Sequence, residues 1–103
     1  MDVELVWSPQ ARDDLIEIYV TIGLERPAAA ERYFDRIEEK IELLRHQPRL
    51  GGRRSEIWRS ARMLVEAPYL ILYETVPDTD EGSVSVVEIV RIIDGRRDLA
   101  TLF

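Results

Sequence analysis

The sequence predicts a single α+β domain in which an N-terminal strand and an antiparallel helical hairpin pack on a small, mostly antiparallel sheet. The chain has 103 residues, the length of one domain, so residues 1–103 are treated as one unit. Its first half contains two stretches with apolar residues at helical spacing. Its second half contains runs of β-branched and aromatic residues separated by short polar turns, which is typical of paired strands.

The first strand and the first helix meet at a short polar step. Residues 3–7 alternate in side-chain character, as expected for a short strand. Ser8 supplies the hydroxyl of a helix N-cap, and Pro9 suits the first helical position, where no partner is lost with its missing N–H. The helix is expected to end near Gly23, a residue type common at helix C-termini.

The spacing of apolar residues predicts which face of this helix is buried. Five of them recur at intervals of three and four and are expected to face the core: Ala11, Leu15, Ile18, Tyr19 and Ile22. Asp13, Asp14 and Glu17 are expected on the solvent side, two of them near the positive end of the helix dipole.

A second helix is predicted from Pro27 to just before Pro48, because a residue preceding proline disfavours the helical conformation. Its apolar face comprises Ala30, Phe34, Ile37, Ile41 and Leu44. Only a few residues separate the two helices, so they are expected to form an antiparallel hairpin.

The second half of the chain is predicted to supply the rest of the sheet. Strands are expected over residues 57–59, 62–66, 69–76 and 84–93. The last of these runs is apolar on both faces, which favours a central position because edge strands are rarely so apolar. Short connections predict an antiparallel meander, and Asp98 is expected to cap one final helical turn.

Composition excludes several classes of protein. The chain has no cysteine, which removes disulfides, thiolate zinc sites and thiol catalysis. It lacks both an apolar run long enough to cross a membrane and a signal-peptide pattern, so a cytoplasmic location is expected. A net charge of −6 disfavours nonspecific nucleic-acid binding, because that affinity comes mostly from neutralising phosphates.

Arginine is the strongest chemical signal in the sequence. Lys40 is the only lysine among 14 basic residues, and five arginines against one glutamate give residues 49–62 a local charge of +4. The strand-borne arginines are expected to gather on the face of the sheet away from the helices. Two interpretations stay open: a binding face for an anionic partner, or a surface salt-bridged by Glu56, Glu66, Glu88, Asp94 and Asp98.

Other motifs point to no enzyme chemistry. His46, the single histidine, falls in the last turn of the second helix, where the dipole favours an imidazolium. The acidic turn over 77–82 lacks the spacing of an EF-hand loop and is expected to be a solvated hairpin tip. The glycines of residues 48–54 lack phosphate-loop spacing and are expected to supply a turn of unusual φ. No catalytic residue, metal or cofactor is predicted.

A series of short motifs follows a fixed order along nearly the whole chain. They are Trp7-Ser8-Pro9-x-Ala11-x-x-Asp14-Leu15-x-x-Ile18, Pro27-x-Ala29-Ala30, Leu44, Pro48, Gly51-Gly52-Arg53, Arg62-x-Leu64, Tyr69-x-Ile71-x-Tyr73 and Val90-Arg91-Ile92-x-x-Gly95-x-Arg97-Asp98-Leu99. In this order they resemble the ParE-type toxins of the RelE/ParE toxin–antitoxin superfamily. Each motif alone is weak; the ordered series is specific.

The resemblance implies the toxin of a type II toxin–antitoxin system, neutralised by a ParD-like antitoxin. RelE-like members cleave mRNA on the ribosome with basic residues and commonly a tyrosine near the C-terminus, whereas ParE-like members inhibit DNA gyrase without known catalysis. Here Phe103 stands in place of that tyrosine, and no lysine follows Lys40. Arginine is a poor base because its pKa exceeds about 12. Gyrase inhibition by binding is therefore preferred.

The resemblance also suggests two groups of contact residues. The predicted target-binding residues are Arg62, Arg91, Arg96, Arg97 and Phe103. The predicted antitoxin-binding residues are Arg49, Arg53, Arg54 and Arg59, with apolar anchors of the antitoxin along the helical hairpin. No membrane or sequence-specific nucleic-acid partner is expected.

Two alternatives stay open at this point. One is a RelE-like, ribosome-dependent endoribonuclease, and the other is a binding module with the toxin fold but without toxicity. Asp94 stands where relatives commonly have histidine, and the chain is more acidic than many of them.

Overall fold

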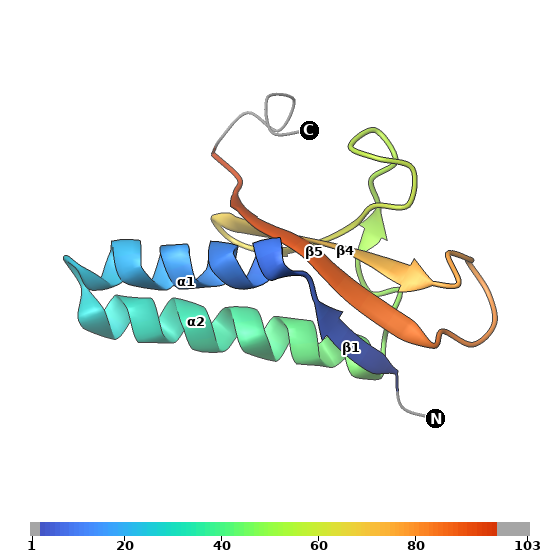
Figure 1. Cartoon of the computed structure of the whole chain (residues 1–103), viewed down its shortest axis with the longest axis horizontal. Coiled ribbons are helices and arrows are strands. Elements are labelled where there is room, and N and C mark those ends of the chain that lie inside the picture. The colour runs from blue at the N-terminus through green and yellow to red at the C-terminus, as the bar shows by residue number, and fades with distance from the viewer. Residues whose placement is uncertain (1–2, 97–103) are drawn as a thin grey trace.

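The computed structural model describes residues 3–96, which form a helical layer against one sheet (Figure 1). In chain order the elements are β1 (Glu4–Trp7), α1 (Pro9–Gly23), α2 (Pro27–Glu42), the 3-10 helix η1 (Leu43–Arg45), β2 (Gly52–Arg53), β3 (Arg62–Glu66), β4 (Tyr69–Val76) and β5 (Val86–Asp94). Within this range no helix has the length and apolar character needed to cross a membrane.

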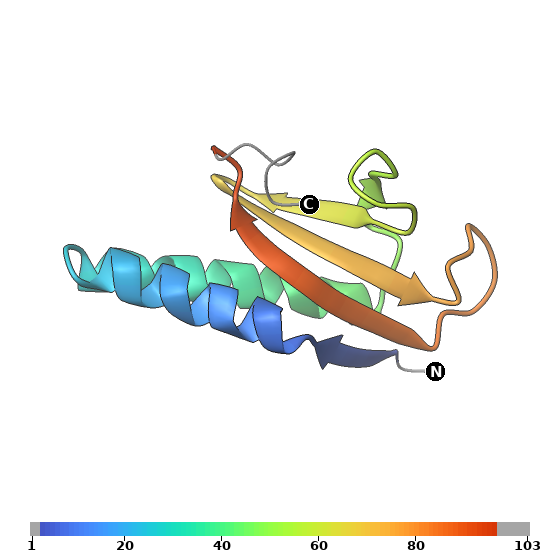
Figure 2. The ribbon, with the colours of Figure 1, turned by 45° about the horizontal axis from the view of Figure 1, so that its top comes forward.

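The strands form one sheet in the order β1-β5-β4-β3-β2. Strands β2 to β5 make an antiparallel meander, while β1 pairs parallel with β5 from Glu4↔Val86 to Trp7↔Ile89. The two helices lie side by side on one face of this sheet (Figure 2). The predicted α+β class, the helical hairpin and the central position of β5 are confirmed.

The core lies between the helices and the sheet. Its fully buried members include Ile37, Ile41 and Leu44 from the second helix and its extension, and Ile71, Tyr73 and Ile89 from the central strands. Because apolar residues recur along α2 at helical spacing, one stripe of that helix covers the central strands and removes apolar surface from water.

Ser8 fastens the start of α1 to the edge of β5. Its N–H donates to the Ile89 carbonyl at 2.9 Å, continuing the β1–β5 ladder by one bond. Its hydroxyl donates to the Val90 carbonyl at 2.8 Å and accepts the Ala11 N–H at 3.0 Å, so one side chain caps the helix and holds it on the strand.

Asp14 continues this attachment six residues further on, nearly two turns along the helix. Its carboxylate accepts the Ile92 N–H at 2.9 Å and the Arg91 Nε–H at 2.7 Å. The pairing of β1 with β5 ends at Trp7 and Ile89. Beyond that point no strand covers this edge of β5, so the Ile92 N–H faces α1 and needs another acceptor. The expectation that Asp14 faces solvent is therefore wrong: only 7% of the residue is exposed.

Two further expectations are contradicted by the structure. The predicted strand over 57–59 is wrong: turn bonds from Ile57 N–H to the Arg54 carbonyl and from Ala61 N–H to the Trp58 carbonyl replace it, and β2 pairs with β3 instead. The expectation that the glycines of residues 48–54 adopt an unusual φ is also wrong, because Gly82 is the only glycine with positive φ in the described range. The turn expected at Asp98 lies outside the described residues.

Replacing Asp14 with alanine is expected to lower the free energy of unfolding by about 2–4 kcal/mol, because Arg91 and the Ile92 N–H lose their shared acceptor. Urea unfolding of Asp14→Ala measures this loss. Asp13→Ala, at an exposed site on the same helix, should stay within about 0.5 kcal/mol of the wild type. Equal stability of the two variants would contradict the assigned role.

Candidate functional site

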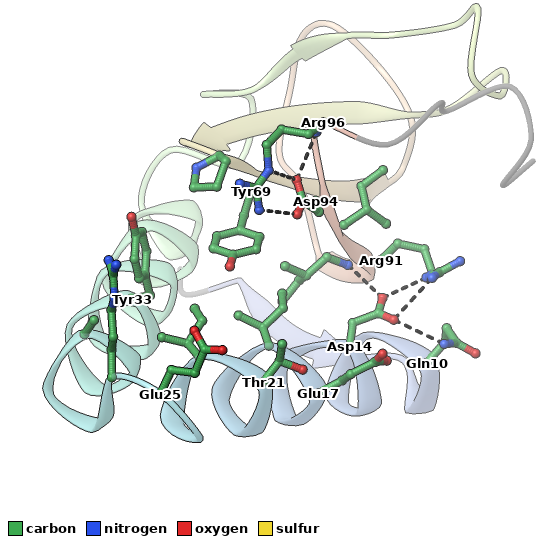
Figure 3. Close-up of a pocket in the computed structure, with 17 residues that line it drawn as sticks. Gln10, Asp14, Glu17, Thr21, Glu25, Tyr33, Tyr69, Arg91, Asp94 and Arg96 are labelled. Atoms are coloured by element: carbon green, nitrogen blue, oxygen red, sulfur yellow. Dashed lines mark hydrogen bonds and ion pairs between the residues drawn. The ribbon is translucent and has the colours of Figure 1, made fainter.

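A cleft of about 560 Å³ opens between α1, the start of α2 and the adjoining ends of β4 and β5 (Figure 3). The Asp14–Arg91 ion pair lies on one of its walls. On another wall, Arg96 makes a bidentate ion pair with Asp94, with the Nε–Oδ1 distance at 2.9 Å and the Nη2–Oδ2 distance at 2.6 Å. The cleft thus presents paired charges, which suits recognition of a polar partner surface.

Two tyrosines line the cleft between these charges. Tyr33 and Tyr69 meet edge to face, with ring centroids 5.6 Å apart. Burial raises the pKa of the Tyr69 phenol, and nearby Asp94 acts in the same direction. The phenol therefore stays neutral at physiological pH and can contribute hydrogen bonds and apolar contact, but not a base.

A second cluster holds the loop between β4 and β5, residues 77–85. We call Arg49, Arg53 and Arg62 the arginine clasp. Arg53 donates to Asp78 at 2.9 Å and to Asp80 at 2.8 Å, and Arg49 donates to the Thr79 and Gly82 carbonyls at 2.8 and 2.9 Å. The loop was expected to be a solvated hairpin tip, and residues 77–83 are indeed exposed; in addition, the clasp fixes its acidic side.

Arg62 is the buried member of the clasp, with 5% of the residue exposed. Its Nη1 donates to the Gly51 carbonyl at 2.9 Å and its Nη2 reaches Asp80 at 3.3 Å. Its Nε has no hydrogen-bond partner among the described residues. Arg53, whose hydrogen bond stabilises the carboxylate, holds the pKa of Asp80 below its ordinary value, so Asp80 stays charged at neutral pH.

Gly51 supports the clasp through a close contact with Tyr73. The Tyr73 hydroxyl accepts the Gly51 N–H at 2.8 Å and donates to the Pro48 carbonyl at 2.9 Å. Burial raises the pKa of this phenol. A Cβ on Gly51 would meet the Tyr73 ring at 2.6 Å, so glycine is required here for close packing and not for its φ.

The structure separates the predicted target-binding residues. Arg91 binds Asp14 on α1 and Arg62 binds Gly51 and Asp80, so the two guanidinium groups hold different elements. Their gathering on the face away from the helices is not seen, because Asp14 draws Arg91 to the helical layer. Arg96 lies at the cleft, and Arg97 and Phe103 lie outside the described residues.

The predicted antitoxin-binding arginines are only partly brought together. Arg49 and Arg53 share the β4–β5 loop, whereas Arg54 pairs with Glu56 at 2.7 Å and Arg59 is exposed on a turn. The salt-bridged interpretation is correct for Arg54–Glu56 and Arg96–Asp94, but the partner of Arg91 was not foreseen.

Sequence reasoning missed an apolar stripe on the outer side of α1. Ile16 and Val20 of α1 and its C-cap residue Leu24 are 59%, 51% and 82% exposed and recur every four residues, so they line one side of the helix and its end. Tyr19, expected in the core, is also 39% exposed and packs edge to face on Phe34. The four-residue spacing of these apolar residues is the signal in the sequence that indicates the stripe.

The helical hairpin on a five-stranded sheet is the α+β arrangement that the family resemblance implies. The chain matches the model of the family described as ParE toxin of type II toxin–antitoxin system, parDE, over residues 5–99, and it belongs to that family.

The fold is similar to a solved structure described as "Chromosomal ParDE TA system from P. aeruginosa". The TM-score is 0.71 at 23% sequence identity, and the match covers 89% of this chain and 95% of that chain. No curated protein sequence matches this chain.

Gly51→Ala is expected to lower the free energy of unfolding by about 1–3 kcal/mol, because the new Cβ overlaps the Tyr73 ring and the Met63 carbonyl. Chemical denaturation of the purified variants measures the effect. Gly52→Ala is the matched control, since nothing lies within 4 Å of its Cβ position. A Gly51→Ala protein as stable as Gly52→Ala would refute the close-packing explanation.

Proposed function

We propose that this toxin acts in the cytoplasm by binding DNA gyrase and inhibiting it without covalent chemistry, and that a cognate ParD-like antitoxin neutralises it. Membership of the ParE family supports the toxin role and the antitoxin partnership. The gyrase target rests on the family resemblance and on the state of the side chains that a nuclease would need.

The commitment of these side chains to internal contacts carries the preference for binding over cleavage. RNA cleavage needs a group that accepts the 2′-hydroxyl proton and cations that stabilise the phosphorane. The Tyr73 hydroxyl is hydrogen-bonded to two backbone groups, and burial raises its pKa, so it is a poor base. The guanidinium groups of Arg62 and Arg91 donate to acceptors inside the protein. The Lys40 Nζ, on α2, lies 4.0 Å from the Glu66 Oε1, so this cation also has an internal partner.

Among the predicted target-binding residues that the structure describes, Arg96 has the most accessible side chain, 73% exposed. Its exposed guanidinium has further N–H donors with which to bind a carboxylate of the target. We assign Arg91 a supporting role at this end of the protein, whereas Arg62 holds the arginine clasp at the other end of β4. Arg97 and Phe103 stay proposed contacts.

The purified toxin should inhibit DNA supercoiling by gyrase, and Arg96→Ala should raise the half-inhibitory concentration roughly tenfold, equal to about 1.4 kcal/mol. Arg36→Ala, at an exposed site on α2, is the matched control and should inhibit like the wild type. Unaffected supercoiling at high micromolar toxin would remove gyrase as the target. Codon-by-codon mRNA cleavage in a translation extract would establish the endoribonuclease instead.

The outer stripe of α1 is the proposed docking surface for the apolar anchors of the antitoxin. Its three members form one continuous row, and Asp13 and Glu17 flank the row with negative charge. A partner helix or extended segment that carries apolar anchors beside basic residues complements such a surface. The arginine clasp and Arg59 are proposed as the polar part of the same interface.

Val20→Glu should raise the antitoxin dissociation constant at least tenfold, roughly 1.4 kcal/mol or more, because a carboxylate would be buried at the centre of the apolar contact. Titration calorimetry with the antitoxin encoded beside the toxin gives this value. Val65→Glu introduces the same change at an exposed β3 site and should leave affinity unchanged. Equal affinity for Val20→Glu would exclude the α1 stripe from the interface.

A further inference from the structure

The arginine clasp holds the β4–β5 loop by two kinds of contact. Arg53 donates to Asp78 and to Asp80, two carboxylates spaced i, i+2, which point to the same side of an extended chain. Arg49 donates to the backbone carbonyls of Thr79 and Gly82. The clasp therefore contacts both acidic side chains and peptide backbone, which are features of an acidic polypeptide segment.

The loop satisfies this cluster incompletely. Arg62 reaches Asp80 at 3.3 Å, longer than the roughly 2.7–2.9 Å typical of a charge-assisted hydrogen bond, and its buried Nε has no partner among the described residues. The Asp80 side chain is 75% exposed. The buried Arg62 guanidinium therefore has one unused N–H donor and one long hydrogen bond to an exposed carboxylate. A ligand with better-placed acceptors can bind it more strongly than the loop does.

The clasp also adjoins an edge of the sheet. Arg53 belongs to β2, a two-residue strand at the end of the strand order whose residues are both exposed. Within residues 3–96, β2 pairs with β3 on one side and with no strand on the other. An extended segment can therefore lie along β2 with its acidic side chains near Arg53 and Arg62.

We propose that the arginine clasp is a docking site for an extended acidic segment of a partner protein, with carboxylates two residues apart, and that the β4–β5 loop is an internal stand-in that this segment displaces. The inference deepens the proposed antitoxin contact and rests on it only for the identity of the partner. Contacts to backbone carbonyls favour a polypeptide over a nucleic acid as the occupant.

Tethering gives the loop a strong advantage over any external segment. A short tether corresponds to an effective concentration in the millimolar range, so the wild-type clasp is occupied before a partner arrives. Removing the two loop carboxylates should free the clasp for an external ligand. The loop would then act as a built-in competitor that restricts the clasp to partners able to make additional contacts elsewhere.

The experiment uses the full-length protein labelled with ¹⁵N and a synthetic peptide copying residues 76–84, VPDTDEGSV, titrated to millimolar concentration. The Nε–Hε resonances of the arginines report binding. We expect the Asp78→Asn/Asp80→Asn variant to bind this peptide at least tenfold more tightly than the wild type. Adding Arg53→Gln to that variant, or replacing both peptide aspartates with asparagine, should weaken binding at least tenfold.

The control variant Asp35→Asn/Glu38→Gln removes the same two charges from the exposed side of α2 and should bind like the wild type. Equal affinity of the unmasked, control and wild-type proteins would overturn the proposal, as would peptide binding that survives Arg53→Gln. A clasp that takes tripolyphosphate but not the peptide would make this a phosphate site and equally overturn it. Neither gyrase nor antitoxin is present, so failure here is independent of failure of the proposed function.

Discussion

The attachment of α1 to the open edge of β5 is the constraint on which the rest of the structure depends. Strand β1 pairs with β5 over four residues only, and beyond Ile89 the edge of β5 would leave backbone groups without partners. Ser8 and Asp14 take over these groups from the first turns of the helix. Residues 7–14 thereby end β1, begin α1 and supply hydrogen-bond partners to backbone groups at the neighbouring edge of β5.

This attachment also fixes which side of α1 faces solvent. Because Ala11, Asp14 and Leu15 must face the sheet, residues on the opposite side of the helix must face water, although they include isoleucine, valine and leucine. An apolar row exposed in this way has no role in the packing of the described chain, which is typical of a surface reserved for a partner.

The arginines divide into structural and accessible groups. Arg91 neutralises a buried carboxylate, and Arg62 ties Gly51 and the β4–β5 loop to β3, so both hold the fold in place. Arg96 and Arg53 have their partners at the surface, where a competing carboxylate can exchange with little desolvation. This division agrees with the proposed inhibition by binding, in which the accessible arginines exchange their internal partners for those of the target.

The sequence by itself determined the class of fold, the helical hairpin, the central position of β5 and the family, because apolar periodicity, the Ser8-Pro9 step and the order of motifs are local signals. The tertiary structure alone decided the side on which Asp14 lies, the partner of Arg91 and the fixing of the acidic loop by Arg49 and Arg53. These are pairings between residues 25 to 77 positions apart. Helix periodicity assigns a carboxylate to solvent unless something buried needs it, and only the assembled sheet shows that the Ile92 N–H does.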